Sequence, residues 1–231
     1  MRLVAWDALP EELKNEQVRP YYEALSKKRV QLVGKRCFDV AISIVMLVLL
    51  SPVFLGLAIA IKLDSPGPVF YRQERVTQYG KRFRIFKFRT MCDRADQLGS
   101  AVTIDGDARI TRVGAKIRDY RLDEVSQLID VLRGTMTFVG TRPEAVRYVE
   151  SYSPEMMATL LLPAGVTSTA SIHFKDEDEL LNAADDVDKV YVEDILPRKM
   201  EYNLQDVKNF SLPRDVRIMF KTVGAVAKRG D

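Results

Sequence analysis

The 231-residue sequence predicts an α+β fold that is mostly helical and contains one β-hairpin. Segments with helical periodicity carry most of the apolar residues, and they do not alternate with strands as in a Rossmann-type sheet. Two strand-like runs stand together within residues 69–90, with Gly80 in the turn between them. An uncharged apolar run, residues 40–61, is long enough for a membrane segment.

The composition narrows the class of protein. The formal net charge is +3 and hydrophobic residues make up 47% of the chain, so a core can form outside the apolar run. Such a mild basic charge indicates no nucleic-acid partner. The two cysteines, Cys37 and Cys92, and the single histidine, His173, show no spacing typical of a disulfide framework or a zinc site. We expect the apolar run to be retained, because no cleavage site of small residues follows it.

The apolar run is compatible with two membrane topologies. As a straight helix it would reach about 33 Å, one hydrocarbon thickness. Pro52 removes a backbone hydrogen bond to the carbonyl of Val48 and predicts a kink, while the Ser51 hydroxyl could satisfy a freed backbone group. Basic residues flank the run on both sides, which favours both ends on the cytoplasmic side. A kinked transmembrane helix and a re-entrant helix–break–helix both remain open from these residues.

Other elements follow from periodicity and from chain-breaking residues. Residues 10–33 predict an amphipathic helix interrupted at Pro20, which could lie on a membrane surface. A helix is expected from Thr111 to Arg133, ended by Gly134. Loops are expected at 100–110 and 138–144, and irregular or short β-structure is expected at 161–172. Further helices are expected at 91–99, 143–151, 154–161 and 213–228. Another helix should follow the acidic stretch 176–186 and end at about Asn203.

The segment 118–134 carries the strongest chemical signal. Asp123 and Glu124 stand at the start of an amphipathic helix, where acidic residues often cap amides and oppose the helix dipole. Two adjacent carboxylates also allow one to attack while the other holds a metal. A carboxylate pair beside arginines suits Mg²⁺ and a diphosphate substrate, although the same cations could form a solvated or lipid-facing surface. The nearby basic residues are Arg109, Arg112, Lys116, Arg118, Arg121 and Arg142.

Several blocks of the sequence resemble one protein family. KRCFDVAISIVMLVLLSPVF, FRIFKFRTM and DARITRVGAKIRDYRLDEVSQLIDVLRGTMTFVGTRPE occur in this order and resemble the bacterial sugar transferases. These are monotopic polyprenyl-phosphate glycosyl-1-phosphate transferases, or small phosphoglycosyl transferases, and the resemblance covers residues 34–170. It implies transfer of a sugar-1-phosphate from a UDP-sugar to polyprenyl (undecaprenyl) phosphate through a covalent aspartyl intermediate, with release of UMP. This would be the first membrane step of polysaccharide or glycoconjugate synthesis.

The resemblance also implies roles for individual residues. Asp123 falls on the family nucleophile, and Glu124 falls on the adjacent catalytic residue that is implicated in Mg²⁺ binding. Arg118 and Arg142 fall on phosphate-binding arginines, and we add Arg112 from the same basic group.

The family's membrane break falls on Ser51 and Pro52, which favours the re-entrant topology. Asp188 is a second candidate metal ligand, although a solvated helix face explains it equally well. The chain departs from the family at 165–170, where no tryptophan is available for nucleotide or sugar contacts.

We therefore expect three parts: an N-terminal amphipathic extension at 1–33, a re-entrant membrane hairpin at 34–64 and a cytoplasmic catalytic domain at 65–231. The expected location is the cytoplasmic leaflet of the bacterial inner membrane, with downstream glycosyltransferases as further partners. Two other interpretations compete. A non-catalytic lipid-binding or scaffold protein would have no need of the Asp123–Glu124 pair. A peripheral enzyme of another phosphate chemistry, such as a phosphatase, would release phosphate and no UMP.

Overall fold

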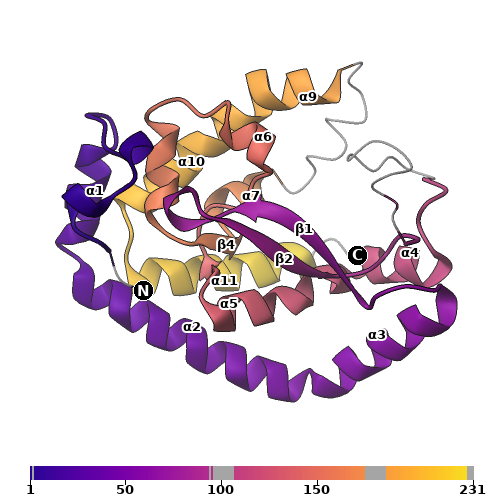
Figure 1. Cartoon of the computed structure of the whole chain (residues 1–231). Helices are drawn as coiled ribbons and strands as arrows, with labels where there is room; N and C mark the ends of the chain where they lie inside the picture. Colours follow the sequence, from indigo (N-terminus) through magenta and orange to yellow (C-terminus); the bar gives the residue numbers. More distant parts are fainter. Residues whose placement is uncertain (2, 94, 96–106, 175–185, 228–231) are drawn as a thin grey trace.

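The fold is known from a computed structural model that describes residues 1, 3–93, 95, 107–174 and 186–227. Helices dominate these residues and two small sheets accompany them, which confirms the mostly helical α+β prediction (Figure 1). The expected loop at 100–110, the helix at 91–99 and the acidic stretch at 176–186 lie largely outside the described residues.

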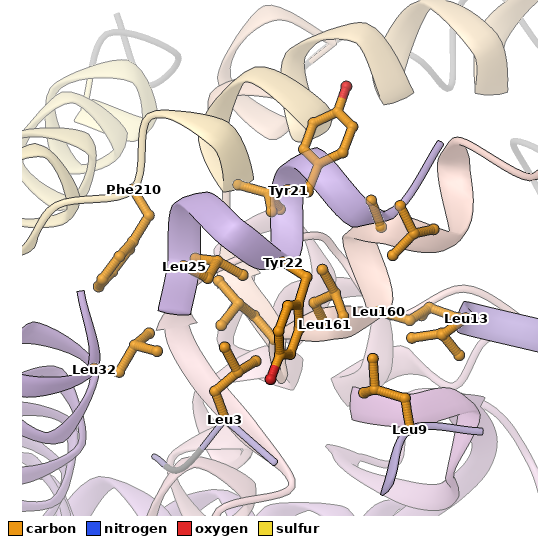
Figure 2. Close-up of a cluster of buried hydrophobic side chains, with 14 of the residues drawn as sticks. Leu3, Leu9, Leu13, Tyr21, Tyr22, Leu25, Leu32, Leu160, Leu161 and Phe210 are labelled. Carbon is orange, nitrogen blue, oxygen red and sulfur yellow. The ribbon is translucent and has the colours of Figure 1, made fainter. Parts of the chain in front are cut away.

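The N-terminal residues do not form one amphipathic helix interrupted at Pro20. They form two short 3₁₀ turns, Trp6–Ala8 and Glu11–Leu13, followed by helix α1, Arg19–Ser26. Pro20 lies in the first turn of α1, where its fixed φ and missing N–H are tolerated. The apolar side chains of this segment are buried against residues 160–162 and Phe210 (Figure 2). The buried residues of the segment are Leu3, Leu9, Leu13, Val18, Tyr21, Tyr22 and Leu25, and Leu32 at the start of the next helix joins them.

Helices α2, Arg29–Leu49, and α3, Ser51–Asp64, meet at a sharp bend of 61° (Figure 1). Ser51 Oγ donates a hydrogen bond of 2.7 Å to the Val48 carbonyl, the group that Pro52 leaves without its helical donor. Among the described residues, no single helix is long and apolar enough to cross a membrane, but the bent pair passes that test together. Exposed apolar side chains near the bend are Ile44, Val45, Val48, Leu49, Val53, Leu55 and Ile59.

The predicted β-hairpin is present. Strands β1, Phe70–Val76, and β2, Arg82–Phe88, pair antiparallel, with Phe70 opposite Phe88 and Val76 opposite Arg82. A 3₁₀ turn, η3 at Gln78–Gly80, connects them, and Gly80 adopts a positive φ of 72°.

The helix expected from Thr111 to Arg133 is broken into three pieces. Helix α4, Arg112–Asp119, is followed by the 3₁₀ helix η5, Leu122–Gln127, and by α5, Leu128–Arg133. Arg121 between them has a φ of 51°, which interrupts the helical path. Gly134 ends α5 in the left-handed region, as its position predicts.

A second sheet was not expected, although short β-structure was one of the two expectations for residues 161–172. Strand β3, Met136–Val139, occupies part of the predicted loop, and it pairs parallel with β4, Ala164–Thr167. Both strands are only four residues long, too short for a clear period-2 pattern. The sheet is joined to the hairpin through Thr77, whose Oγ1 donates to the Thr135 carbonyl and accepts from Ala164 N–H.

Most of the remaining helices follow the predicted segments, but one, at Thr169–His173, lies where irregular or short β-structure was expected. The expected helices at 143–151 and 154–161 are shorter than predicted: α6 covers Val146–Val149 and the 3₁₀ helix η6 covers Met156–Leu161. Near the C-terminus lie α7, Thr169–His173; α9, Val187–Val190; the π-helical turn η7, Tyr191–Ile195; α10, Leu196–Lys208; and α11, Leu212–Ala227.

Buried polar groups join the first half of α2 to the core. Lys35, 2% exposed, forms an ion pair with Asp215 of α11. Thr137 Oγ1 of β3 donates to Asp39 Oδ2 at 2.6 Å, and the Arg36 guanidinium donates to two carbonyls at the end of α5. Because buried charges are costly without partners, these pairs favour one specific position for α2.

Candidate active site

The Asp123–Glu124 pair lies in η5, which is attached to the edge of strand β2. Ser126 Oγ donates to the Phe86 carbonyl at 3.0 Å, and Phe86 N–H donates to Asp130 Oδ2 at 2.8 Å. These two hydrogen bonds let side chains satisfy backbone groups that a free strand edge would expose. They also fix the neighbouring residue of β2, Lys87, beside the carboxylate pair.

Glu124 is held between two cations. Lys87 Nζ donates to Glu124 Oε1 at 2.9 Å, and the Arg142 guanidinium donates to both carboxylate oxygens, with 3.2 Å between Nη1 and Oε2. Burial alone would raise the pKa of Glu124, but Arg142 and Lys87 outweigh it and hold the pKa well below its usual range. Glu124 therefore stays ionised and positions both cations.

Arg142 reaches this point because β3 and β4 approach each other very closely. Gly140 N–H donates to the Thr167 carbonyl at 3.0 Å, and Gly165 N–H donates to the Thr141 carbonyl at 2.8 Å. A Cβ on Gly165 would lie 2.2 Å from backbone atoms of Gly140, so only glycine fits there. The contact sets the path of the chain immediately before Arg142.

Asp123 differs from its neighbour. Its carboxylate is partly buried, and no other residue of the described chain forms a hydrogen bond or an ion pair with it. Burial raises the pKa of Asp123; Lys87 opposes this rise, Glu124 adds to it and Arg118 opposes it. A desolvated carboxylate that is close to cations but bound by none of them has lone pairs available for an electrophile.

Of the other predicted phosphate binders, the structure brings Arg118 to the pair and leaves Arg112 away from it. Arg118 Nε donates to Thr90 Oγ1 at 3.0 Å, and its charge acts on Asp123. Gly114 permits this arrangement, because a Cβ there would meet the Thr90 carbonyl oxygen at 2.0 Å. Arg112 is exposed at the other end of α4, where its charge acts on Asp64 of α3.

Asp188 lies in a different set of contacts. Arg147 Nη1 donates to Asp188 Oδ2 at 2.9 Å, and Tyr148 Oη donates to Asp188 Oδ1 at 2.6 Å. Across the described residues, no three acidic, cysteine or histidine side chains come together as a metal site. The adjacent Asp123 and Glu124 carboxylates are therefore the donor set to consider for Mg²⁺, which commonly uses only one or two carboxylates beside phosphate oxygens.

Two cations near the site were not singled out from the sequence. Lys87 stands 37 residues before Glu124, and only the hairpin register shows it on the core-facing side of β2 with Ile85. Arg75 Nη1 lies 3.5 Å from the Pro143 carbonyl, and its pKa is lowered by burial, with Glu144 opposing this effect and Arg142 adding to it. Alternation in the predicted strand places Lys87 on the same face as Ile85, but it does not show that Glu124 lies beside that face.

The family model of bacterial sugar transferases matches residues 30–229, most of the chain. The chain belongs to the bacterial sugar transferase family. This result confirms the resemblance seen in the sequence blocks, and the matched range includes the Asp123–Glu124 pair, Lys87 and Arg142.

Curated relatives of this family member include phosphotransferases that act on undecaprenyl phosphate. A UDP-N-acetylgalactosamine-undecaprenyl-phosphate N-acetylgalactosaminephosphotransferase of Aeromonas hydrophila is 37% identical over 195 residues, covering 83% of this chain and 43% of the relative. A UDP-glucose:undecaprenyl-phosphate glucose-1-phosphate transferase of Escherichia coli K12 is 32% identical over 217 residues, covering 92% and 44%.

A shorter relative matches along almost its whole length. The exopolysaccharide production protein PSS of Rhizobium leguminosarum is 36% identical over 208 residues, covering 87% of this chain and 98% of the relative. The chain thus spans less than half of the Aeromonas and Escherichia proteins and nearly all of the Rhizobium protein.

Proposed function

We propose that the chain transfers a sugar-1-phosphate from a UDP-sugar to polyprenyl phosphate, giving polyprenyl-diphosphate-sugar and UMP. The observation that carries this proposal is the pairing of an unbound carboxylate, Asp123, with an adjacent carboxylate that holds Arg142 and Lys87 beside it. The names of the Aeromonas and Escherichia relatives support undecaprenyl phosphate as the acceptor. A scaffold protein would have no need of such an arrangement.

The first step uses Asp123 as a nucleophile. One of its carboxylate oxygens attacks the sugar-linked phosphorus of the UDP-sugar, and the bond from that phosphorus to the bridging oxygen of UMP breaks. UMP leaves with the electron pair, and Asp123 carries the sugar phosphate as an acyl phosphate ester. Lys87, Arg118 and Arg142 offset the negative charge of the approaching diphosphate, which would otherwise repel the carboxylate.

The second step regenerates the carboxylate. A phosphate oxygen of the polyprenyl phosphate attacks the same phosphorus, and the bond to Asp123 breaks with its electron pair returning to the carboxylate. Two half-reactions at one residue suit a donor from water and an acceptor from lipid, because the two substrates need not be bound together. The same cations stabilise the phosphoryl group in both steps.

The residues present are compatible with Mg²⁺. Asp123 and Glu124 would offer it carboxylate oxygens, and the diphosphate of the donor would provide further oxygen ligands. When bound, Mg²⁺ would neutralise charge on the departing UMP. Asp188 lies in a separate set of contacts with Arg147 and Tyr148 and is not needed for this donor set.

We further propose that α2 and α3 enter the cytoplasmic leaflet of the bacterial inner membrane and return at the bend. The 61° angle, the Ser51–Val48 hydrogen bond and the exposed apolar side chains support this placement. It puts the transfer at the headgroup layer, where polyprenyl phosphate and downstream glycosyltransferases can be reached. Single cysteines placed before α2 and after α3 should react with an impermeant maleimide only from the cytoplasmic side; reaction of one from outside would contradict the re-entrant path.

The decisive experiment measures UMP release from UDP-glucose, UDP-N-acetylgalactosamine and other UDP-sugars, with undecaprenyl phosphate and Mg²⁺. Asp123→Asn should abolish release, whereas Asp119→Asn, an exposed carboxylate in the same segment, should retain it. A phosphosugar adduct on wild-type Asp123, seen by mass spectrometry before acceptor is added, would support the covalent step. Undiminished release by Asp123→Asn would refute that role, and free phosphate without UMP would favour a phosphatase.

A further inference from the structure

A second group of cations gathers on the side of the hairpin opposite Lys87. Side chains alternate along a strand, so Arg72 and Arg84 lie on the face that carries Phe86, while Lys87 lies on the other. The Arg72 guanidinium is 3.5 Å from the centroid of the Phe86 ring, and Arg133, at the end of α5, is 5.6 Å from it. We call Arg72, Arg84 and Arg133 the arginine triad.

The triad is poorly neutralised by the protein. Within the described residues, Arg84 and Arg133 have no carboxylate in an ion pair, and both are exposed. Glu74, opposite Arg84 in the hairpin, lies instead 3.8 Å from Arg82. Arg72 and Arg133 lie beside the same ring and Arg84 lies next to Arg72 on the same hairpin face, so the three charges leave an excess of positive potential at this surface.

The internal contacts of the triad keep its members together despite this repulsion. Arg72 Nε donates to the Arg84 carbonyl at 3.1 Å, and Arg84 Nε donates to the Arg72 carbonyl at 3.3 Å. The nearby Asp130 carboxylate, which accepts the Phe86 N–H, offsets part of the charge of Arg72 and Arg133 and leaves the three arginines with a net positive charge. Burial lowers the pKa of Arg72, Asp130 opposes this, and Arg133 and Arg84 lower it further.

The position of the triad indicates the kind of anion. The same hairpin face continues to Phe88, whose ring lies 5.2 Å from that of Phe54 in α3, so this face is turned toward the bent helix pair. Helix α3 exposes apolar side chains, including Leu55 and Ile59. An anionic group that binds the triad from the side of α3 can therefore belong to a molecule whose apolar part lies against these exposed side chains.

We propose that the arginine triad binds the phosphate of an anionic membrane phospholipid, at a place separate from the site of sugar-phosphate transfer. The proposal rests on the proposed membrane placement of α2 and α3. Guanidinium groups match phosphate oxygens, and cations next to the cytoplasmic leaflet are attracted by its negative lipids. A lipid bound there holds one face of β2 at the membrane while the opposite face presents Lys87 to Glu124.

The test measures lipid binding to the full chain in neutral detergent micelles by native mass spectrometry. Phosphatidylglycerol is the probe, and zwitterionic phosphatidylcholine is its reference. The variant Arg84→Gln/Arg133→Gln removes two exposed charges without breaking an ion pair of the described residues. The control Lys81→Gln/Lys208→Gln removes two other exposed charges that form no ion pair among the described residues, one of them in the turn of the same hairpin.

We expect wild type to prefer phosphatidylglycerol and the triad variant to bind it roughly thirtyfold more weakly, with little change in the control. Equal weakening in both variants, or no preference in wild type, would overturn the proposal. Undecaprenyl phosphate is then added as a competitor. The triad belongs to the acceptor site instead if two results are found together: undecaprenyl phosphate displaces phosphatidylglycerol one for one, and the triad variant fails to release UMP in lipid-free detergent.

UMP release in the same samples separates this inference from the proposed function. Wild-type protein that releases UMP but shows no preference for phosphatidylglycerol contradicts only the lipid site. Protein that binds phosphatidylglycerol through the triad but releases no UMP from any donor contradicts only the transferase activity.

Discussion

Replacing Gly165 with alanine tests how the protein places Arg142. The new Cβ would lie 2.2 Å from the backbone nitrogen and oxygen of Gly140, more than an ångström inside the ordinary contact distance of 3.4 Å or greater. Backbone atoms cannot rotate away, so β3 and β4 must separate and weaken the Gly140–Thr167 and Gly165–Thr141 hydrogen bonds. Overpacking costs about 1–3 kcal/mol and each lost hydrogen bond about 1 kcal/mol, so the free energy of unfolding should fall by roughly 3–5 kcal/mol.

Thermal unfolding in detergent, followed by circular dichroism, measures this loss. In a protein of this size 1 kcal/mol corresponds to about 2–4 °C, so Tm should fall by roughly 10 °C. Gly224→Ala in α11 is the matched control: its Cβ would meet nothing within 4 Å, and alanine favours a helix, so Tm should stay equal or rise. If Gly165→Ala unfolded at the wild-type temperature, the close strand contact and our account of how Arg142 is positioned would both be wrong.

Three further predictions concern buried charges. Lys87→Met should move the acidic limb of the pH–rate profile of UMP release to higher pH, because Lys87 opposes the raised pKa of Asp123. Glu124→Gln should make the free energy of unfolding less dependent on pH in the acidic range. The pKa of Glu124 is lowered by folding, so its ionised carboxylate stabilises the fold above the unfolded-state pKa of about 4.3, and this stabilisation is lost as the pH falls toward the folded-state pKa. Lys35→Met should lower the free energy of unfolding by about 3–5 kcal/mol, because it leaves the buried Asp215 carboxylate without its partner. The double variant Lys35→Met/Asp215→Leu should recover most of this loss. Equal losses in the single and the double variant would contradict the pairing.

Local chemistry made part of the fold predictable from the sequence. The hairpin follows from period-2 runs around Gly80, the bend from Pro52, and the end of α5 from Gly134, because each depends on residues close together in the chain. The carboxylate pair was also visible as a local motif.

Features that depend on distant residues could not be predicted in this way. The parallel pairing of β3 and β4 requires Gly140 and Gly165 to meet, although 25 positions separate them. An amphipathic pattern at 10–33 shows that one side is apolar, but not that residues 160–162 would cover it. Lys87 enters the site because two hydrogen bonds attach η5 and α5 to the edge of β2: Ser126 Oγ donates to the Phe86 carbonyl, and Asp130 accepts from the Phe86 N–H.

The continuity of α2 has a mechanical consequence. Its first half is fixed in the core by Lys35, Arg36 and Asp39, and its second half carries the exposed apolar side chains that lead to the bend. Because α2 is one uninterrupted helix, its length determines how far the bend lies from Asp123 and in which direction around the helix axis the bend points. A single alanine inserted after Ile44 would advance the bend by about 1.5 Å and swing it by about 100° around the helix axis. On the proposed membrane placement of α2 and α3, the number of residues in α2, more than their hydrophobicity, would then decide whether the bend and Asp123 face the same lipid layer.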